Sequence, residues 1–475
     1  MSGSTTSRSR VLAPVIATAA TAVVVIAGVL IPQAAPAGGG PAVEVQPRTT
    51  TLCTSDPENE RGLELVAGAL AEGPGGLNLA DLAEERAVGD PLTDTGVVAK
   101  GVEPGPYTVA ATGGLTSTAA GVLLGSQDSG PDRGLAAQAC GLPGTEHWFV
   151  GLGAHEVQFS TVLVTNPDAQ AAEVELRVHG PRGPVTAPGS SGIAVPPHAT
   201  RAIPLEGMVT AEGPLAVEVR ATAGRVGAVV QDRHRSGTQP AGTDWIAAAG
   251  LPATDQVIPG VPGGAGDRDL VLVNPGERTA TVRVDALTDS GSFTLKGADA
   301  VDVPPASTVR VPLTEALEGE EAALRLVAEQ PVTGALLATT EHSDLASDTA
   351  AAVPAEPIRS PTVLPVVAAR DVTGRVLLSN TSADSVQATV VLRDRSGKEI
   401  EQVEVEVAPG ATTGVDAEGD GVWAEVTTEG AVPLHVAVVL SSERDDTAGL
   451  AWLPGTSPRV GGELPPVERD PRVAR

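Results

Sequence analysis

The residues that could take part in catalysis or metal binding are few and widely spaced. The chain has seven histidines, His147, His155, His179, His198, His234, His342 and His435. None of them belongs to an HExxH motif or to another close ligand spacing. No G-x-S-x-G motif is present, and the glycine-rich stretch 263–266 lies between two expected strands, so we interpret it as a loop. The sequence therefore predicts no catalytic residue, no metal site and no cofactor.

Four acidic loops are the other candidate for chemistry. They read QDSGPDRG (127–134), QDRHRSGTQPAGTDW (231–245), EHSDLASDT (341–349) and SSERDDTAG (441–449). Carboxylate oxygens are the ligands that Ca²⁺ prefers, and such loops could hold it. However, the loops lack a D-x-D-x-D-G pattern, and Arg stands beside Asp in some of them. We interpret them as solvated turns and keep calcium as the alternative.

The N-terminal segment predicts export. Arg8 and Arg10 precede residues 11–31, which carry no charge and are long enough to cross a bilayer. We expect a cytoplasmic segment at 1–10, a transmembrane anchor at 11–31, a linker at 32–40 and an extracytoplasmic remainder. The stretch 35–37 (Ala-Pro-Ala) resembles a cleavage site, so a cleaved signal and a secreted protein are the alternative.

Cys53 and Cys140 are the only cysteines. An even number of cysteines in an exported chain predicts a disulfide. Two buried free thiols are the alternative. We expect a structural bridge between Cys53 and Cys140 rather than a redox centre.

Composition limits the partners. A net charge of −28 opposes binding to nucleic acid or to an anionic lipid surface. Aromatic residues make up only 2% of the chain, which counts against sugar-stacking sites. The 55 Gly and 40 Pro are spread along the chain, as expected for many turns between short strands.

An internal repeat positions these residues. Asn166-Pro167, Asn274-Pro275 and Asn380-Thr381 each end an alternating apolar run, and Asp56-Pro57 ends a similar run earlier. Each Asn is followed 27 or 29 residues later by VPP or VAP. Each unit closes on a small-residue segment that ends in Pro, and we call these four the closing segments: ACGLP (139–143), AAGLP (248–252), AAAVP (350–354) and LAWLP (450–454). We expect the Asn residues to form turns and to have no catalytic role.

Short alternating runs within each unit predict an all-β fold. Seven such runs in about 105 residues are typical of an immunoglobulin-like sandwich. We therefore expect four tandem sandwiches, at 41–145, 146–253, 254–358 and 359–456, each with its own core, and a Pro-rich charged tail at 457–475. The alternative is a β-propeller, in which each unit supplies two four-stranded blades. In the first unit, Asn78 predicts the cap of a short helix over 79–87.

The stretch EHWFVGLGAHEVQFSTVLVTNP (146–167) carries a resemblance to a known group of proteins. The pattern, with CGLPGTEHWFVG (140–151) as its most specific part, resembles extracytoplasmic tandem β-repeats. The whole chain, over about residues 10–460, resembles an uncharacterised actinobacterial family with a domain of unknown function. The resemblance implies a place in the cell envelope and no established activity, and it supplies no catalytic or binding residue.

We therefore expect a non-enzymatic protein of the cell envelope. It would be a single-pass, membrane-tethered scaffold or binding protein, and its partner would be another envelope protein or a wall component. A module that binds carbohydrate or cell wall, and an exported enzyme with an unrecognised site, are the alternatives. The sequence leaves the oligomeric state open.

Overall fold

The computed structural model describes residues 47–58, 62–70, 73–358, 361–366, 372–417, 421–430, 432–444 and 447–455. These residues belong to one compact all-β unit. The expected cytoplasmic segment, anchor, linker and tail lie outside the described residues. Within the described part of the chain, no helix has the length and apolarity needed to cross a membrane.

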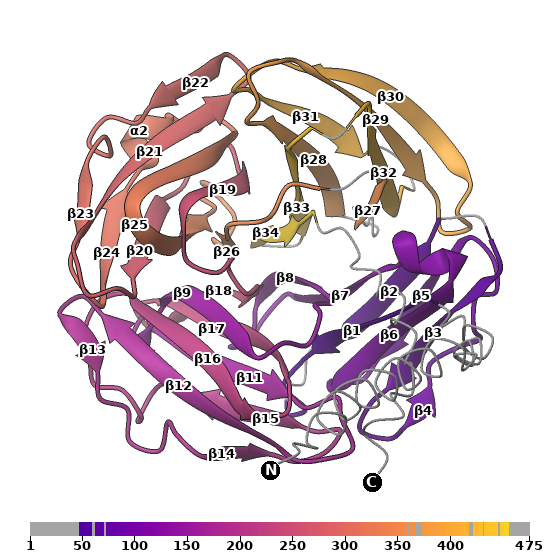
Figure 1. The fold of residues 1–475 in the computed structure, drawn as a ribbon, viewed down its shortest axis with the longest axis horizontal. Coiled ribbons are helices and arrows are strands. Elements are labelled where there is room, and N and C mark those ends of the chain that lie inside the picture. The colour runs from indigo at the N-terminus through magenta and orange to yellow at the C-terminus, as the bar shows by residue number, and fades with distance from the viewer. Residues whose placement is uncertain are drawn as a thin grey trace, which may run out of the picture. The chain divides into compact units, whose positions relative to one another are not determined.

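The strands form antiparallel sheets that come in pairs along the chain (Figure 1). We name the sheets 1a to 4b. The first pair consists of sheet 1a, with β1 (Arg48–Thr54), β6 (Pro106–Gly113), β3 (Gly75–Asp81) and β4 (Arg86–Ala87), and sheet 1b, with β5 (Gly96–Val102), β2 (Leu63–Ala69), β7 (Ala120–Gln127) and β8 (Gly134–Ala139). The second pair consists of sheet 2a, with β13 (Gly183–Val185), β12 (Ala172–Gly180), β16 (Leu215–Ala223), β9 (Glu146–Leu152) and β14 (Ile193–Val195), and sheet 2b, with β10 (Ala154–His155), β11 (Gln158–Thr165), β17 (Gly227–Ser236), β18 (Gln239–Ile246) and β15 (Thr200–Pro204).

The remaining strands follow the same scheme. The third pair consists of sheet 3a, with β22 (Gly291–Thr294), β21 (Ala280–Thr288), the first half of β25 (Ala322–Thr339), β19 (Ala253–Val261) and β23 (Val301–Val303), and sheet 3b, with β24 (Ser307–Pro312), β20 (Arg268–Asn274), the second half of β25 and β26 (Thr349–Ala352). The fourth pair consists of sheet 4a, with β27 (Thr362–Pro365), β32 (Trp423–Thr428), β29 (Val386–Arg393) and β30 (Glu399–Val407), and sheet 4b, with β31 (Thr412–Ala417), β28 (Val372–Asn380), β33 (Leu434–Arg444) and β34 (Thr447–Pro454). Only two short helices accompany these strands, η1 (Gly114–Ser117) and α2 (Thr314–Leu317), in the part of the chain that is described.

The strand order differs from that of an immunoglobulin-like sandwich. In the first and fourth pairs, one sheet holds the first, sixth, third and fourth strands, and the other holds the fifth, second, seventh and eighth. The second and third pairs add short strands to the same plan. An immunoglobulin domain divides seven strands between its sheets in another order. The all-β prediction is confirmed, but the expected seven-stranded arrangement is wrong.

The sheet pairs contact one another in a closed cycle. The last strands of the four pairs, β8, β18, β26 and β34, each contact two of the others. Each a sheet also contacts the b sheet of the next pair, through β1 with β17, β9 with β25, and β19 with β33. The fourth pair returns to the first through β27 and β7. This arrangement is the one that the propeller alternative describes.

The apolar core extends across the boundaries between the expected domains. In β20, Leu270, Val271, Leu272 and Val273 are all fully buried, so both faces of this strand are covered. One continuous apolar cluster joins residues of the second and third pairs to residues of sheet 4b, such as Trp452. A continuous apolar run indicates two-sided burial, whereas strict alternation indicates one wet face. The units therefore share cores instead of each burying its own.

The helix expected at 79–87 is also absent. Leu77 and Leu79 are buried while Asn78 between them is exposed, and all three lie in β3, which pairs with β6. Residues 82–85 form a turn that leads into β4. The alternation of GLNLAD fits a strand with one buried face, and the pairing of β3 with β6 overrides the capping signal of Asn78.

The recurring Asn residues are turn-forming groups in the core. Asn166, Asn274 and Asn380 have an exposed fraction of 0%. The Nδ2 of each donates to a carbonyl four residues ahead and to a second one 27 or 29 residues ahead: Val195 for Asn166 (3.1 Å), Val303 for Asn274 (3.0 Å) and Val407 for Asn380 (3.0 Å). The fixed spacing between Asn and VPP in the sequence therefore corresponds to a hydrogen bond.

Candidate functional site

The four closing segments meet at one cavity. The first two segments leave the last strand of their pair and pass beside its first strand, whereas the fourth is the end of β34. Leu52 and Gly141 exchange backbone hydrogen bonds of 2.8 and 2.9 Å, and the Ala249 N–H donates to Trp148 (2.8 Å). The second and third segments are joined by the Gly250 N–H, which donates to Pro354 (3.1 Å). Small residues allow this close approach of backbone to backbone.

A disulfide holds the first closing segment. Cys53 of β1 and Cys140 are bonded, with their Cα atoms 4.4 Å apart, as the sequence predicts. Cys140 also lines the cavity. The bridge therefore fixes part of the cavity wall to sheet 1a. The other three segments have no cysteine and depend on packing and hydrogen bonds alone.

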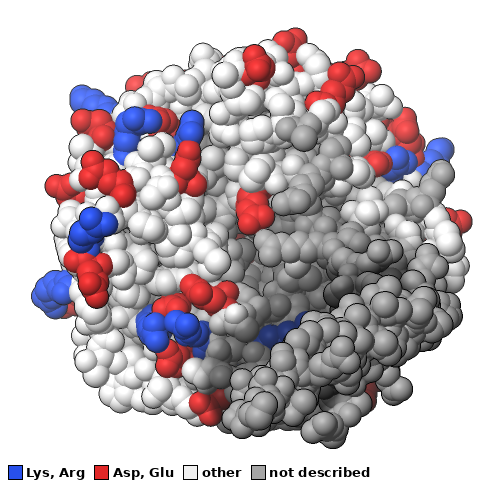
Figure 2. All heavy atoms as spheres, viewed as in Figure 1, with Lys and Arg blue, Asp and Glu red and all other residues white. Residues whose placement is uncertain are grey.

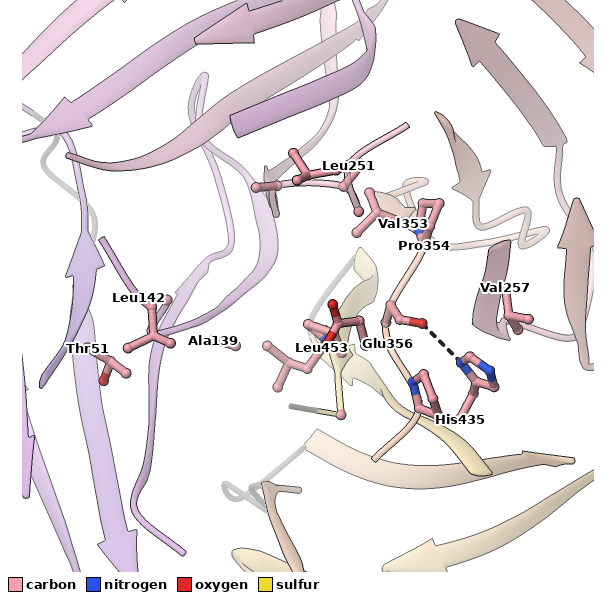
Figure 3. Close-up of a pocket in the computed structure, with 18 of the residues that line it drawn as sticks. Thr51, Ala139, Leu142, Leu251, Val257, Val353, Pro354, Glu356, His435 and Leu453 are labelled. Carbon is pink, nitrogen blue, oxygen red and sulfur yellow. Dashed lines mark hydrogen bonds between the residues drawn. The ribbon is translucent and has the colours of Figure 1, made fainter. Parts of the chain in front are cut away.

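The cavity has a volume of about 1400 Å³ and a mostly aliphatic wall. Figure 3 shows Leu142, Leu251, Pro354 and Leu453, one residue from each closing segment, around the same space. Leu142 and Leu251 are exposed large apolar side chains, whereas Leu453 is buried. No Trp, Tyr or Phe is among the lining residues that the structure describes.

Acidic groups predominate among the charged residues of the described wall. Glu146 accepts a hydrogen bond from Trp148 Nε1 (2.9 Å). Asp255 is paired with Arg325 through contacts of 2.6 and 3.0 Å. Glu356 also lines the cavity, and Figure 3 draws it near Leu453. The described lining therefore contains three carboxylates and one guanidinium.

Two histidines of the wall are neutral at pH 7. The Nδ1–H of His435 donates to the Ala355 carbonyl (3.0 Å), and burial lowers the pKa of His435 to about 4 despite this bond. His147 is bonded through Nε2 to the Val226 carbonyl (2.9 Å), and burial lowers its pKa as well. His147 is half-buried within β9, and His155 forms the end of β10.

The cavity wall offers little for catalysis. Its hydroxyl groups, in the described residues, come from Thr49, Thr51 and Thr381. The ring nitrogens of His147 and His435 that are hydrogen-bonded contact backbone carbonyls and not a hydroxyl or carboxylate. A nucleophile needs an adjacent base that a third group orients.

Three of the acidic loops each bury an Asp, which corrects the interpretation of these three residues as solvated. Asp132, Asp244 and Asp348 have exposed fractions of 8%, 2% and 0%. The Oδ2 of Asp348 accepts hydrogen bonds from the Leu135 N–H (2.8 Å) and the Leu450 N–H (3.0 Å), and thereby joins the third pair to the first and the fourth. The Asp445-Asp446 part of the fourth loop lies outside the described residues.

The remaining histidines are separated from the cavity, each in a local role. His198 contacts Glu85 (2.9 Å), and His234 contacts Asp232 (2.7 Å). The rings of His179 and Trp148 lie 5.6 Å apart, and His342 is in an exposed turn. Among the described residues, no group of His, Cys, Asp and Glu is arranged to hold a metal ion.

Sequence reasoning found the closing segments but missed the cavity that they build. It also missed the buried Asp residues. A signal was present for Asp348, which stands directly before β26 and its small residues. A carboxylate directly before a buried strand indicates a structural acceptor rather than a solvated turn.

Comparison with known proteins places the chain in a family. A family of unknown function, DUF5719, matches residues 95–418, about two thirds of the chain. The chain belongs to the DUF5719 family. The match includes stretch 140–151, on which the resemblance rested, and most of the cavity wall. No curated protein matches the chain.

Proposed function

We propose that this DUF5719 protein is a non-enzymatic binding protein of the cell envelope, and that the cavity at the closing segments holds its partner. The observation that carries the proposal is the convergence of all four closing segments on one space of about 1400 Å³ with exposed aliphatic side chains. Cavities of this kind are the usual places where proteins bind other molecules. The uncharged stretch at 11–31 supports a membrane tether with the body outside the cytoplasm.

A protein partner fits the cavity better than a sugar does. Sugar rings are usually held by stacking on aromatic side chains, and the described wall has no Trp, Tyr or Phe. On the face seen in Figure 2, acidic and basic side chains are interspersed over much of the described surface. Exposed ion pairs such as Arg225–Asp168 contribute little to binding or stability. The aliphatic cavity is the more distinctive surface.

Site-specific photocrosslinking in the native envelope tests this proposal. A photoreactive amino acid would replace Leu251 at the cavity, or Val157 as a control. These side chains are 57% and 48% exposed, so both probes reach solvent. We expect mass spectrometry to identify a discrete partner from position 251 and none from position 157. Equal, non-specific labelling at the two positions would contradict the proposal.

A further inference from the structure

Strand β30 has an unpaired outer edge. It is the end strand of sheet 4a, where it pairs with β29 alone, and Figure 1 draws it as the outermost strand of that sheet. Residues 401–407 pair with β29 without a shift in register. A strand that is paired on one side leaves half of its backbone N–H and C=O groups pointing the other way. Among the described residues, the backbone hydrogen bonds of 401–406 all belong to the ladder with β29.

The other three a sheets have short or interrupted strands at the equivalent edge. Sheet 1a ends in β4, which has two residues. Sheet 2a ends in β13 and β14, of three residues each, and sheet 3a ends in β22 and β23, of four and three residues. In contrast, β30 has nine residues. Short edge strands hinder pairing with another chain, so the fourth pair, of those described, keeps the longest template for an added strand.

Core packing fixes the inner face of β30. Val405 and Val407 are 7% and 0% exposed and belong to the core that the first and fourth pairs share, and Val403 packs against that core. Glu404 and Glu406 alternate with these valines and are exposed. A strand that is already held in place needs no further ordering before another strand is added, which favours binding.

The edge carries negative charge that is not neutralised within the described chain. The strand contains four exposed glutamates, Glu399, Glu401, Glu404 and Glu406. The ion pairs of the described residues include none of them, because the nearby arginines have other partners. Arg393 is bound to Glu425 (2.8 Å). Arg395 is bound to Glu64 (3.1 Å), and Lys398 alone precedes the strand as a single positive charge.

The charges distinguish between two occupants of this edge. In a second copy of β30, glutamates would face glutamates, and like charges opposite each other in a strand pair are destabilising. A strand with Lys or Arg at every second position places positive charges opposite Glu404 and Glu406, because side chains on one face recur every second residue. The other face of such a strand lies along Val403 and Val405, where apolar side chains fit.

We propose that the outer edge of β30 adds an extended segment of a partner protein as a further strand, and that this segment alternates basic and apolar residues. Backbone hydrogen bonds supply the affinity, and the basic side chains opposite Glu404 and Glu406 supply the specificity. Residues 399–407 do not line the cavity. The inference therefore goes beyond the proposed function and concerns a separate surface.

Fluorescence anisotropy with the full-length chain and labelled peptides of equal length tests the ligand class. One peptide alternates Lys and Val, a second alternates Glu and Val, and a third has the residues of the first with all lysines in one block. We expect the alternating Lys peptide to bind at least about tenfold more tightly than either of the others. Its affinity should decrease as the salt concentration rises from about 0.05 M to about 0.5 M, because salt screens exposed charges.

Backbone methylation separates strand addition from simple attraction between charges. Two further versions of the alternating Lys peptide would carry N-methyl groups on the lysines or on the valines. Successive N–H groups of a strand point to opposite edges, so only one of these two sets donates to β30. We expect methylation of one set to weaken binding at least about tenfold more than methylation of the other. Equal effects of the two would contradict strand addition.

Charge reversal locates the surface. The double variant E404K/E406K should weaken binding of the alternating Lys peptide by at least about tenfold and should bind the Glu peptide more tightly than the unsubstituted protein does. E318K/E320K is the matched control, because Glu318 and Glu320 are exposed after α2 at the same spacing and the change in net charge is the same. All four positions are on the surface, so thermal melting should be similar for both double variants.

Three outcomes would overturn the inference. One is an equal loss of affinity in the two double variants, because overall charge would then attract the peptide. Another is equal affinity for the alternating and the block Lys peptides. The third is a self-associated form, seen by sedimentation, that the alternating Lys peptide dissociates, because the occupant would then be a second copy. A partner crosslinked at position 251 that E404K/E406K still binds would keep the proposed function and leave the peptide experiments to decide on β30.

Discussion

Asn274 shows how a single side chain connects distant parts of a sheet pair. Its Nδ2 donates to Arg278 (2.6 Å), Val303 (3.0 Å) and Pro304 (3.3 Å), and its Oδ1 accepts from the Gly276 N–H (3.0 Å). The side chain has no access to water. A buried carbonyl that loses its donor has no solvent to replace it. The residue therefore acts on stability through the groups that it satisfies.

Replacing Asn274 with Ala should lower the free energy of unfolding by about 2–4 kcal/mol, since several buried backbone groups lose their partner at once. Denaturant unfolding followed by circular dichroism measures this change. Asn78→Ala is the matched control, because Asn78 is exposed in β3 and should cost less than about 0.5 kcal/mol. Equal costs at the two positions would show that the buried bonds of Asn274 do not stabilise the fold.

His435 should make the protein less stable in weak acid. Its pKa falls from the usual 6.5 to about 4 in the folded state because burial disfavours the charged ring. Below pH 6.5 the unfolded chain binds a proton that the folded chain does not, so stability decreases from pH 6.5 down to about pH 4 and this contribution then levels off. The loss amounts to roughly 3 kcal/mol at pH 4.

Thermal unfolding as a function of pH tests this prediction. His435→Asn keeps a donor near the Ala355 carbonyl but removes the titrating ring, so the slope between pH 6.5 and 4 should become shallower. His342→Asn, at an exposed histidine, is the control for a His-to-Asn substitution outside the core. An unchanged slope in the His435 variant would mean that other groups cause the acid sensitivity.

At the scale of strands, β26 is joined to two other pairs by one carboxylate. Asp348 precedes β26 and accepts the N–H groups of Leu135 in β8 and Leu450 in β34. A Cβ on Gly242 would lie 2.5 Å from Asp348 Oδ1, so this glycine leaves room for the carboxylate between the strands. The last strands of three pairs therefore meet at one side chain.

Asp348→Ala should lower the free energy of unfolding by about 2–6 kcal/mol, because two buried N–H groups lose their acceptor. Asp348→Asn retains one oxygen and should cost less. Asp344→Ala, in the exposed part of the same loop, is the control. Hydrogen exchange should show faster exchange in β8 and β34 of the Asp348→Ala variant. If both strands stay as protected as in the unsubstituted protein, Asp348 does not hold them together.

The strands themselves were partly predictable from sequence. Val282 and Val284 alternate with Arg283 and Asp285, and the structure places these residues in β21 with the valines buried. The stretch Leu270–Val273 belongs to the run before Asn274 that was expected to alternate, but it is apolar throughout. Its continuous run indicates cover on both faces, but sequence alone does not say which neighbours supply that cover.

At the scale of the molecule, sequence patterns indicated local features such as the turns and the disulfide. They did not determine how the four sheet pairs assemble. The Asn–VPP spacing and the Cys53–Cys140 bridge depend on contacts within one stretch of chain, and they left regular traces in the sequence. The cavity and the position of Asp348 depend on contacts between different units, as between Asp348 and both Leu135 and Leu450, which are 213 and 102 residues away in the sequence. Such contacts place no fixed spacing on the chain, so alternation and turn residues fit an open array and a closed cycle equally well.

The central claim is that the four sheet pairs close into a cycle and thereby build the cavity. In the closed arrangement, the fourth pair meets the first where Arg395 contacts Glu64 (3.1 Å), and Glu64 faces Gly101, the neighbour of the exposed Lys100. Double electron–electron resonance between spin labels at K100C and R395C, with the native disulfide intact, measures this closure directly.

The closed cycle predicts a narrow distance distribution within about 20 Å, because the two positions lie on neighbouring strands and loops. An open array would place two further sheet pairs, each about 30 Å across, between the labels and give more than about 50 Å. A broad distribution centred beyond that distance would contradict the closed cycle, and with it the cavity on which the proposed function depends.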